Sequence, residues 1–360
     1  MDKLARLPAE DRRDIFSEAA ARLGIRPTII EKDFWVCVAL KLLFQKSRFG
    51  KSLVFKGGTS LSKAHGLIER FSEDIDLVLD WNLIGFGDGL RNPMQEFTSK
   101  GKQDQFNKEM NRLAADYIAR TLCPELEDLL RQENVGLAAA VDPDDPHTVN
   151  IRYPAAFAET YIRPEVRLEI GPLASWVPSA THVIRPYAFD VVPGVFENPV
   201  CEVVAIAAER TFWEKATLLH KEAHRKTQIP QRHSRHYYDL YKLAVSRVRA
   251  AALADPKLLQ DVVAFKRRFY PSAWARYDLA VPGSLKLLPA TPLQVKELAQ
   301  DYEEMQVMLF GAPPEFRDIL DELKHLETEI NATAQKDELG STGNGPAIID
   351  GNEGIGQNRS

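Results

Sequence analysis

The sequence predicts an α/β protein in which a sheet-forming part is followed by a helical region. Residues 53–80 have the pattern of a strand, a glycine turn, a helix start and a second strand, and further strand-like segments follow until about residue 207. Beyond that point apolar residues recur with the period of amphipathic helices. We therefore expect one domain over residues 1–205, which includes the sheet, and a helical region over residues 206–330.

Two amphipathic helices are expected before the first strand. They cover residues 9–23 and 28–45, and Thr28 with Glu31 three residues later has the spacing of a capping box at the start of the second helix. The apolar stripe of that helix consists of Phe34, Val38 and Leu42.

A glycine turn follows the first strand, which is the apolar run 53–55. Gly57 and Gly58 turn the chain, and Thr59 and Ser60 stand where a helix can begin. Such a turn can bring backbone N–H groups against phosphates. The simpler alternative is a helix start with Thr59 or Ser60 as its cap.

Two carboxylates lie on one face of the strand that comes next. Period two places Asp74 and Asp76 on one side and Ile75 and Leu77 on the other. Neighbouring carboxylates repel each other, so a fold that holds them together normally supplies a cation such as Mg²⁺. The alternative is a solvated strand face. The order of turn and carboxylate pair favours a nucleotide site.

Segments 55–63 and 70–77 resemble the signature of the AbiEii/AbiGii-type nucleotidyltransferase toxins, which belong to the DNA polymerase β-like nucleotidyltransferase superfamily. The likeness is dense in these segments and thinner over about residues 31–243. It implies a mixed sheet of the polymerase β type and a Mg²⁺-binding pair, Asp74 and Asp76. It also implies a triphosphate-binding turn that consists of Gly57, Gly58, Thr59 and Ser60.

A third carboxylate is usual in polymerase β-like sites, on a strand beside the first pair. Residues 165–170 are the best candidate, because alternation puts Glu165, Arg167 and Glu169 on one face. Both glutamates stay open as candidates, and a basic residue two positions before an acidic one in the family favours Glu169. The alternative is a solvated strand face with an ion pair.

Two further residues are candidates through the resemblance. Lys215 lies in an Arg-Thr-Phe-x-x-Lys context whose lysine contacts the triphosphate in the family, and the alternative is an exposed lysine paired with Glu214 or Glu209. Asp239 lies in an Arg-His-x-x-Asp-Leu element whose aspartate reaches the active site. Its alternative is electrostatic stabilisation of a helix start.

The remaining elements follow from local pattern. Residues 81–103 are rich in Gly and Asn and predict a surface loop, whereas residues 104–132 predict a helix. Strands are expected at 135–141, 148–153, 164–170, 180–189 and 203–207. Helices are expected at 209–223, 237–248, 257–269, 292–310 and 314–330. Residues 331–360 lose the apolar period and predict a disordered tail.

Composition and charge limit the class of protein. The chain is 44% hydrophobic with a net charge of −5, so an overall basic balance does not argue for nucleic acid. A local basic segment at 210–235 has the charge to follow an RNA backbone, or is a solvated helix face. The three cysteines match neither a disulfide framework nor a zinc spacing. Without a signal-peptide core or a membrane-length apolar run, we expect a cytoplasmic protein with no membrane contact.

These observations together predict a metal-dependent nucleotidyltransferase. Two Mg²⁺ ions would be held by Asp74, Asp76 and Glu169, and the substrate would be an NTP. The resemblance implies an RNA acceptor, with the 3′ end of tRNA as the specific candidate, and a toxin neutralised by a cognate antitoxin encoded nearby. The alternatives are a nucleotide-binding regulatory module without transfer activity and a transferase that modifies a protein.

Overall fold

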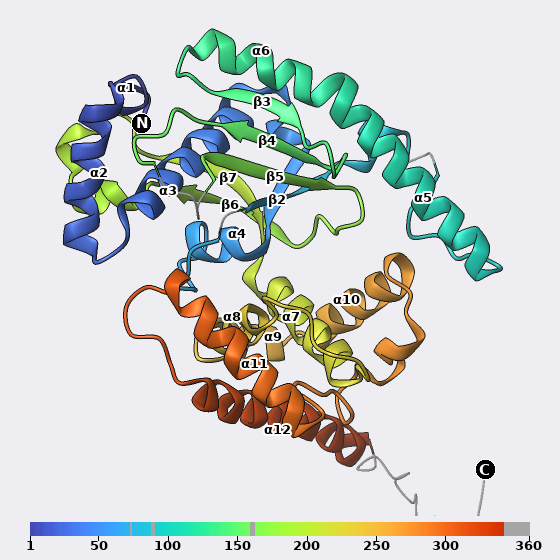
Figure 1. Cartoon of the computed structure of the whole chain (residues 1–360). Coiled ribbons are helices and arrows are strands. Elements are labelled where there is room, and N and C mark those ends of the chain that lie inside the picture. The colour runs from blue at the N-terminus through green and yellow to red at the C-terminus, as the bar shows by residue number, and fades with distance from the viewer. Residues whose placement is uncertain (73, 88–90, 159–162, 342–360) are drawn as a thin grey trace, which may run out of the picture.

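The computed structural model describes residues 1–72, 74–87, 91–158 and 163–341. It has two lobes, a sheet covered by helices and a second lobe made of helices (Figure 1). The mixed α/β class expected from the sequence is therefore confirmed. None of the described helices combines the length and the hydrophobicity needed to cross a membrane.

The described part of the chain forms a seven-stranded mixed sheet in the order β3-β4-β5-β2-β1-β7-β6. β1 is parallel to β7 and β2 is parallel to β5, whereas the other neighbours are antiparallel. The strands are β1 Leu53–Lys56, β2 Asp74–Leu79, β3 Ala138–Val141, β4 Thr148–Arg152, β5 Glu165–Gly171, β6 Ser179–Ile184 and β7 Cys201–Ile206. All of the expected strands are present, although β3 and β6 are shorter than expected.

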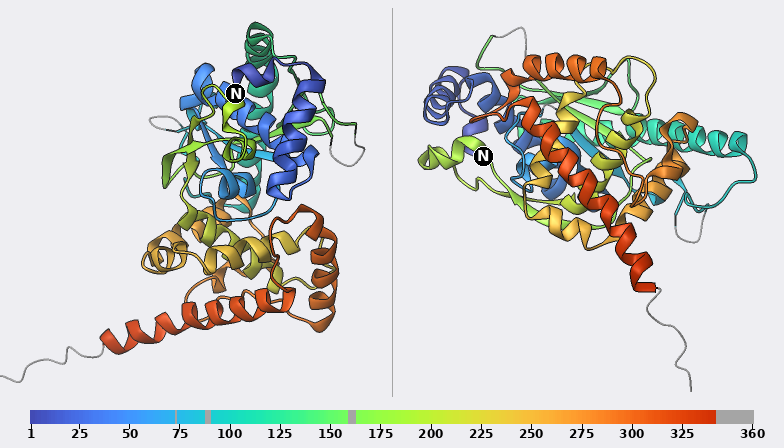
Figure 2. Two further views of the ribbon diagram at one scale, coloured as in Figure 1. Left: turned by 90° about the vertical axis from the view of Figure 1, so that its left-hand side faces the viewer. Right: turned by 90° about the horizontal axis from the view of Figure 1, so that it is seen from below.

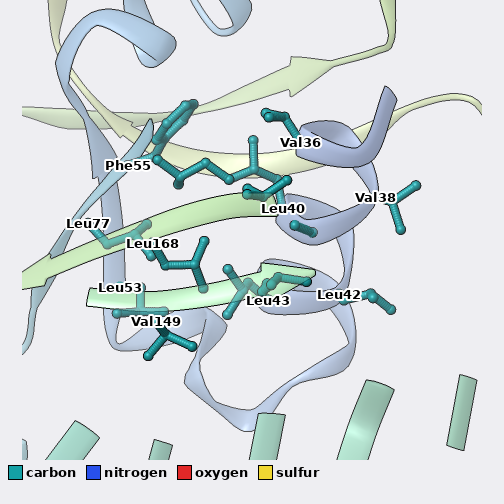
Figure 3. Packing of buried hydrophobic residues seen from close by; sticks show 14 of the residues in the cluster. Val36, Val38, Leu40, Leu42, Leu43, Leu53, Phe55, Leu77, Val149 and Leu168 are labelled. Carbon is teal, nitrogen blue, oxygen red and sulfur yellow. The ribbon is translucent and has the colours of Figure 1, made fainter. Parts of the chain in front are cut away.

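One face of the sheet is apolar and packs on α3 (Pro27–Lys41) and the turns that follow it. Figure 3 shows Leu40 and Leu43 of this segment in one packed cluster with Phe55, Leu168 and Val149 of the sheet. Because strand side chains alternate, the opposite face carries the polar residues of β2 and β5. Burial on one side thus forces the carboxylates to the other side, which faces the helical lobe.

The helices of the sheet lobe correct the expected capping box. They are α1 Asp2–Ala5, α2 Ala9–Leu23, α3 Pro27–Lys41, α4 Gly57–Lys63, α5 Lys100–Tyr117 and α6 Cys123–Glu133. Because α3 begins at Pro27, Thr28 lies inside the helix and its side chain is not a cap. Glu31 accepts a hydrogen bond from the backbone N–H of Ala156 instead, at 2.7 Å. Similarly, α5 begins at Lys100, which shortens the predicted 81–103 loop.

The helical lobe agrees with the sequence in content and differs in boundaries. Its helices are α7 Ala208–Ala223, α8 Ser234–Ala244, α9 Val248–Leu253, α10 Pro256–Phe269, α11 Pro292–Met305 and α12 Phe316–Ser341. The expected 237–248 helix ends early, and α9 is a separate helix. α12 runs along the outer edge of the lobe (Figure 2). It continues past residue 330, so the predicted disorder is wrong for residues 331–341, and residues 342–360 lie outside the described part.

Each lobe has its own hydrophobic core, and the last strand ends at Ile206 just before α7 begins at Ala208. Leu61 and Ile68 from the sheet lobe join the helical core. The segment between them and β2 contacts the chain after α11, where the Phe71 backbone N–H donates to the Met308 carbonyl at 2.7 Å. A division between residues 205 and 206 remains our proposal for the domain boundary.

Candidate active site

The predicted carboxylate pair lies beside β5 on the face of the sheet that is turned toward the helical lobe. In the register of the parallel pair β2 and β5, Asp76 is opposite Glu169 and Asp74 is opposite Arg167. The alternation of burial along both strands puts Asp74, Asp76 and Glu169 on one face. Glu165 is the first residue of β5, and its carboxylate is 3.7 Å from the Arg163 guanidinium. The geometry therefore supports Glu169 over Glu165 as the third carboxylate.

Two basic side chains lie among these carboxylates. Arg167 Nε is 3.6 Å from Asp74 Oδ1, and its Nη2 is 4.0 Å from Glu169 Oε1. Lys56 Nζ is 3.7 Å from Asp76 Oδ1. Burial raises the pKa of Glu169, and Asp74 and Asp76 raise it further by like-charge repulsion. The face therefore carries negative charge that Arg167 and Lys56 only partly balance.

The donor chemistry of this face suits a hard cation, because carboxylate oxygens are the ligands that Mg²⁺ prefers. Asp74, Asp76 and Glu169 supply such oxygens from neighbouring strands. Within the described ranges, however, no three His, Cys, Asp or Glu side chains are gathered closely enough to form a finished metal cage. The residues fit a hard cation in kind, and to hold one their side chains would have to move closer together and displace Arg167 or Lys56.

Gly57 and Gly58 lie directly against the charged groups of the site. Gly57 has a φ of +78°, and a Cβ built on it would overlap the carboxylate of Asp76. A Cβ on Gly58 would overlap Arg70 Nη2 and come within 3.1 Å of Ser72 Oγ. Conformation and space therefore both favour glycine at position 57, whereas at position 58 only the space beside Arg70 and Ser72 is limiting.

Thr59 and Ser60 do not cap a helix, because α4 already begins at Gly57. The Thr59 hydroxyl donates to the Asp74 carbonyl at 2.5 Å, and the Ser60 hydroxyl donates to the Gly57 carbonyl at 2.9 Å. Both side chains are buried. They tie the turn to β2 and to itself, so any contact of this pair with phosphate falls to the backbone N–H groups.

Asp239 is the centre of a buried charge cluster that joins the two lobes. It accepts hydrogen bonds from Arg70 Nε and Nη2 at 2.7 and 2.9 Å, and from Lys215 Nζ at 2.7 Å. Lys215 also donates to His236 Nδ1 at 3.1 Å. Burial alone would raise the pKa of Asp239, but the two cations hold it well below its ordinary value. Burial lowers the pKa of Lys215, and Asp239 offsets part of that effect.

This cluster removes both simpler alternatives for its members. Lys215 is not an exposed lysine paired with Glu214 or Glu209, since its side chain is 12% exposed and bonded to Asp239. Asp239 is not in the first turn of its helix, because α8 begins at Ser234. The sequence predicted that Lys215 and Asp239 belong to one site, and in the structure the two side chains are in direct contact.

Arg70 is the residue that sequence analysis missed. Its guanidinium lies against Gly58 on one side and is bonded to Asp239 of α8 on the other, so it links α8 to the glycine turn. It also contacts the chain after α11 through an antiparallel bridge to Leu309. The available signal was its place in the 70–77 motif, four residues before Asp74.

A cavity of about 660 Å³ borders Asp74 and Glu169. Its basic lining residues are Lys32, Arg70, Arg163, Arg167, Arg232 and Arg235. Its acidic lining residues are Asp74, Glu165, Glu169, Asp301 and Glu304. Ser72 beside Gly58 also lines it, so the cavity extends from the carboxylate face to the glycine turn.

The predicted basic segment 210–235 contains buried and half-buried members. Arg210 is buried and donates to the Val177 carbonyl at 2.8 Å. Lys221 and Arg225, by contrast, lie over the ring of Trp274 at 5.0 and 4.8 Å. Only part of the segment is therefore available to a ligand.

A family model described as the nucleotidyl transferase AbiEii toxin of type IV toxin–antitoxin systems matches residues 41–322. The chain belongs to the AbiEii nucleotidyltransferase toxin family. This confirms the resemblance inferred from the sequence, and it extends the match across the helical lobe. As an AbiEii-family protein, the chain is a transferase of the nucleotidyl class and a toxin-type component of a toxin–antitoxin system.

Comparison with solved structures finds the nucleotidyltransferase toxin MenT4 from Mycobacterium tuberculosis, at 17% identity and a TM-score of 0.43, over 89% of this chain and 98% of that chain. It also finds JHP933 from Helicobacter pylori, at 14% identity and a TM-score of 0.44, over 88% of this chain and 98% of that chain. A search of curated proteins gave no match.

Proposed function

We propose that this AbiEii-family protein transfers a nucleotidyl group from an NTP to an RNA hydroxyl, with the 3′ end of tRNA as the candidate acceptor. The observation that carries the proposal is the register that sets Asp76 opposite Glu169, with Asp74 on the same face and the Gly57 backbone against Asp76. Carboxylates beside a glycine turn are the arrangement that Mg²⁺-dependent transfer of phosphate groups requires.

The cavity beside the carboxylates is the proposed NTP site. Its volume of about 660 Å³ falls within the roughly 300–1,000 Å³ range of small-molecule pockets. Arg70 and Ser72 line one end of the cavity and lie beside Gly58, where backbone N–H groups can bind phosphate. Arginine side chains along its wall suit phosphate oxygens, because a guanidinium binds them through two parallel hydrogen bonds.

Each functional side chain then has a defined task. Asp74, Asp76 and Glu169 would hold two Mg²⁺ ions, which when bound activate the acceptor hydroxyl and neutralise triphosphate charge. Lys215 bonds to Asp239, which also binds the Arg70 guanidinium beside Gly58, and we propose that Lys215 stabilises charge on the departing pyrophosphate. Asp239 fixes Lys215.

In this scheme the acceptor hydroxyl loses its proton to solvent and its oxygen bonds to the α-phosphorus, while the bond from that phosphorus to the α–β bridging oxygen breaks. Pyrophosphate leaves in line with the attacking oxygen. Modification of a tRNA end would stop translation, which fits a toxin, and a cognate antitoxin encoded nearby is the proposed partner. We expect the protein to act in the cytoplasm, where its three free cysteines stay reduced.

Incubation of the pure protein with Mg²⁺, labelled NTPs and total tRNA tests the proposal. Label in RNA supports nucleotidyl transfer to RNA. Label in protein would instead indicate a protein acceptor, and nucleotide binding without any transferred label would indicate a regulatory binding module. Either of these two results would overturn the proposed acceptor.

A further inference from the structure

We propose that Tyr270 and Trp274 form a platform on which the single-stranded end of the RNA acceptor stacks, while Lys221, Arg225 and Lys266 contact its phosphates. We call these five residues the stacking surface. The proposal rests on the proposed function for the identity of the ligand, and it adds where that ligand binds.

The two rings are unusually open for aromatic side chains. Tyr270 is 49% exposed and Trp274 is 40% exposed, and no other Trp, Tyr or Phe in the described ranges is as exposed. Both follow α10 within one short segment. Large exposed aromatic rings gathered in one place indicate a binding surface, and base stacking is sequence-tolerant because every base has a π-face.

The segment that carries the rings is held in place. The Tyr270 hydroxyl donates to the Leu173 carbonyl at 2.6 Å. On the other side, His220 Nε2 donates to the Arg276 carbonyl at 2.9 Å, while His220 Nδ1 accepts from the Lys286 N–H at 3.0 Å. His220 is fully buried in α7. Because both ends of the segment are fixed, the rings are preorganised and a base that stacks on them loses little entropy to loop ordering.

Cations lie over or beside both rings. Lys221 Nζ is 5.0 Å and Arg225 Cζ is 4.8 Å from the centre of the Trp274 ring, and Lys266 Nζ is 5.8 Å from the centre of the Tyr270 ring. Glu222 pairs with Arg225, at the α7 side of the surface. Aromatic rings interleaved with cations are the pattern of proteins that bind single-stranded nucleic acid.

Lys221 is close enough to Lys266 to repel it, as are Lys56 and Lys215 outside the surface, whereas Glu214 attracts it. Burial lowers the pKa of Lys266, and Lys56, Lys221 and Lys215 lower it further, while Glu214 acts in the opposite direction. A polyanion that passes over these ammonium groups would relieve the repulsion, and cation release would add to its affinity.

Lys56 connects the stacking surface with the carboxylates. Lys56 is 3.7 Å from Asp76, and it also lies within electrostatic reach of Tyr270. The cavity, in contrast, is lined by Asp74 and Glu169 and not by Asp76 or Tyr270. A transferase needs two substrates to meet at one point, and this arrangement gives the NTP and the acceptor separate approaches to the same carboxylates.

Single-stranded RNA fits this surface better than duplex RNA, because only unstacked bases are free to lie on aromatic rings. The test measures binding of a fluorescein-labelled single-stranded RNA of about twelve nucleotides, a length within the site sizes of such proteins. A blunt duplex of the same sequence and poly-glutamate serve as competitors. The variants are Trp274→Ala, Tyr270→Ala and Trp274→Phe, with Leu293→Ala on α11, whose side chain is 65% exposed, as the control.

We expect Trp274→Ala and Tyr270→Ala each to weaken single-strand binding by about tenfold, and Trp274→Phe and Leu293→Ala to change it little. Lys266→Ala should reduce the slope of log affinity against log salt concentration by the equivalent of about one phosphate contact. Lys257→Ala on the same helix should leave this slope unchanged. In transfer assays the KM for RNA should rise while the KM for the NTP stays unchanged. Melting temperatures identify any variant that fails to fold, and Lys266→Ala, Tyr270→Ala and Trp274→Phe provide independent tests.

Unchanged single-strand binding in both alanine variants, or equal competition by the duplex or poly-glutamate, would overturn the proposal. Failure of the proposed function gives a different result. If the wild-type protein binds single-stranded RNA through Trp274 and Tyr270 but transfers no nucleotide, the stacking surface is supported and the proposed transfer function is contradicted. If it transfers nucleotide to RNA and the alanine variants keep the wild-type KM for RNA, the transfer function is supported and the stacking surface is contradicted.

Discussion

Arg70 and Asp239 form a two-fold hydrogen-bonded ion pair across the junction of the two lobes, with distances of 2.7 and 2.9 Å. Arg70 precedes the carboxylate strand, and Asp239 lies in α8 of the helical lobe. Since the Arg70 guanidinium also lies against Gly58, the helical lobe supports the glycine turn directly. The candidate active site is therefore a product of both lobes.

Removal of the charge on Asp239 should destabilise the fold. Asp239→Asn leaves Arg70 and Lys215 without their buried counter-charge, which we expect to lower the free energy of unfolding by about 3 kcal/mol or more. Urea denaturation measures the effect. Asp261→Asn, which removes the carboxylate of an exposed pair with Lys257, is the control and should change stability by less than about 1 kcal/mol. Equal, small effects would show that the buried pair is not a structural clamp.

The same pair gives a pH dependence with a defined sign. The pKa of Asp239 is lower in the folded state than in the unfolded chain, so its contribution to stability is complete above the unfolded pKa of about 3.9. That contribution declines as the pH falls through and below this value. The stability difference between wild type and Asp239→Asn should therefore narrow on acidification, and a constant difference between about pH 6 and pH 3 would contradict the assignment.

Gly57 and Gly85 provide a matched test of the glycine turn. Their φ angles are +78° and +79°, but a Cβ on Gly57 would overlap Asp76, whereas a Cβ on Gly85 meets no atom within 4 Å. Gly57→Ala and Gly85→Ala should each lower stability by about 1 kcal/mol through backbone strain. Only Gly57→Ala should also displace Asp76 and abolish transfer. Normal activity in Gly57→Ala would mean that the close approach has no catalytic purpose.

The local pattern of the sequence was sufficient to predict the strands and the strand faces on which the carboxylates lie. The alternation around Asp74, Asp76 and Glu169 is a property of the strand itself, so it can be read without knowledge of the fold. Contacts between distant segments cannot be read in this way. Arg70 and Asp239 are 169 positions apart, and no feature near Arg70 indicates its partner.

Contacts between distant segments also explain the helix ends that sequence analysis missed. The apolar period of α12 stops near residue 330, but Asn331 exchanges two hydrogen bonds with the Leu285 backbone, at 3.0 and 2.9 Å, and anchors the next turn. Thr28 and Glu31 have capping-box spacing, but Glu31 bonds the distant Ala156 N–H instead. Tertiary hydrogen bonds override local propensity in both places.

Lys215 and Lys221 lie on one helix and test different steps. Lys215→Ala should lower turnover by on the order of a hundredfold, because a fixed cation at the leaving pyrophosphate stabilises the transition state more than the ground state. Lys215→Arg should restore only part of the activity, since a guanidinium fork is not a point charge. Lys221→Ala should weaken RNA binding and reduce its salt dependence, with near-normal turnover at saturating substrate. Small and equal effects of both alanine substitutions on turnover would place Lys215 outside the catalytic site.

Glu169 and Glu165 can be separated by their effect on metal binding. Both lie on the same face of β5, but only Glu169 is opposite Asp76. Glu169→Gln should weaken Mg²⁺ binding measured by calorimetry about tenfold or more, because a charged ligand is lost. Glu165→Gln should leave Mg²⁺ affinity near the wild-type value. The opposite ranking would assign the third carboxylate to Glu165.

Transfer of the α-phosphate at the Asp74–Asp76 face is the central claim. The most direct measurement compares NTP labelled at the α-phosphate with NTP labelled at the γ-phosphate, incubated with total tRNA and either wild-type protein or Asp76→Ala. We predict α-label in RNA and γ-label in pyrophosphate for the wild type, and neither product for Asp76→Ala, although the variant folds normally because it loses a like-charge repulsion. Transfer of γ-label to RNA or protein, or undiminished α-transfer by Asp76→Ala, would contradict the account.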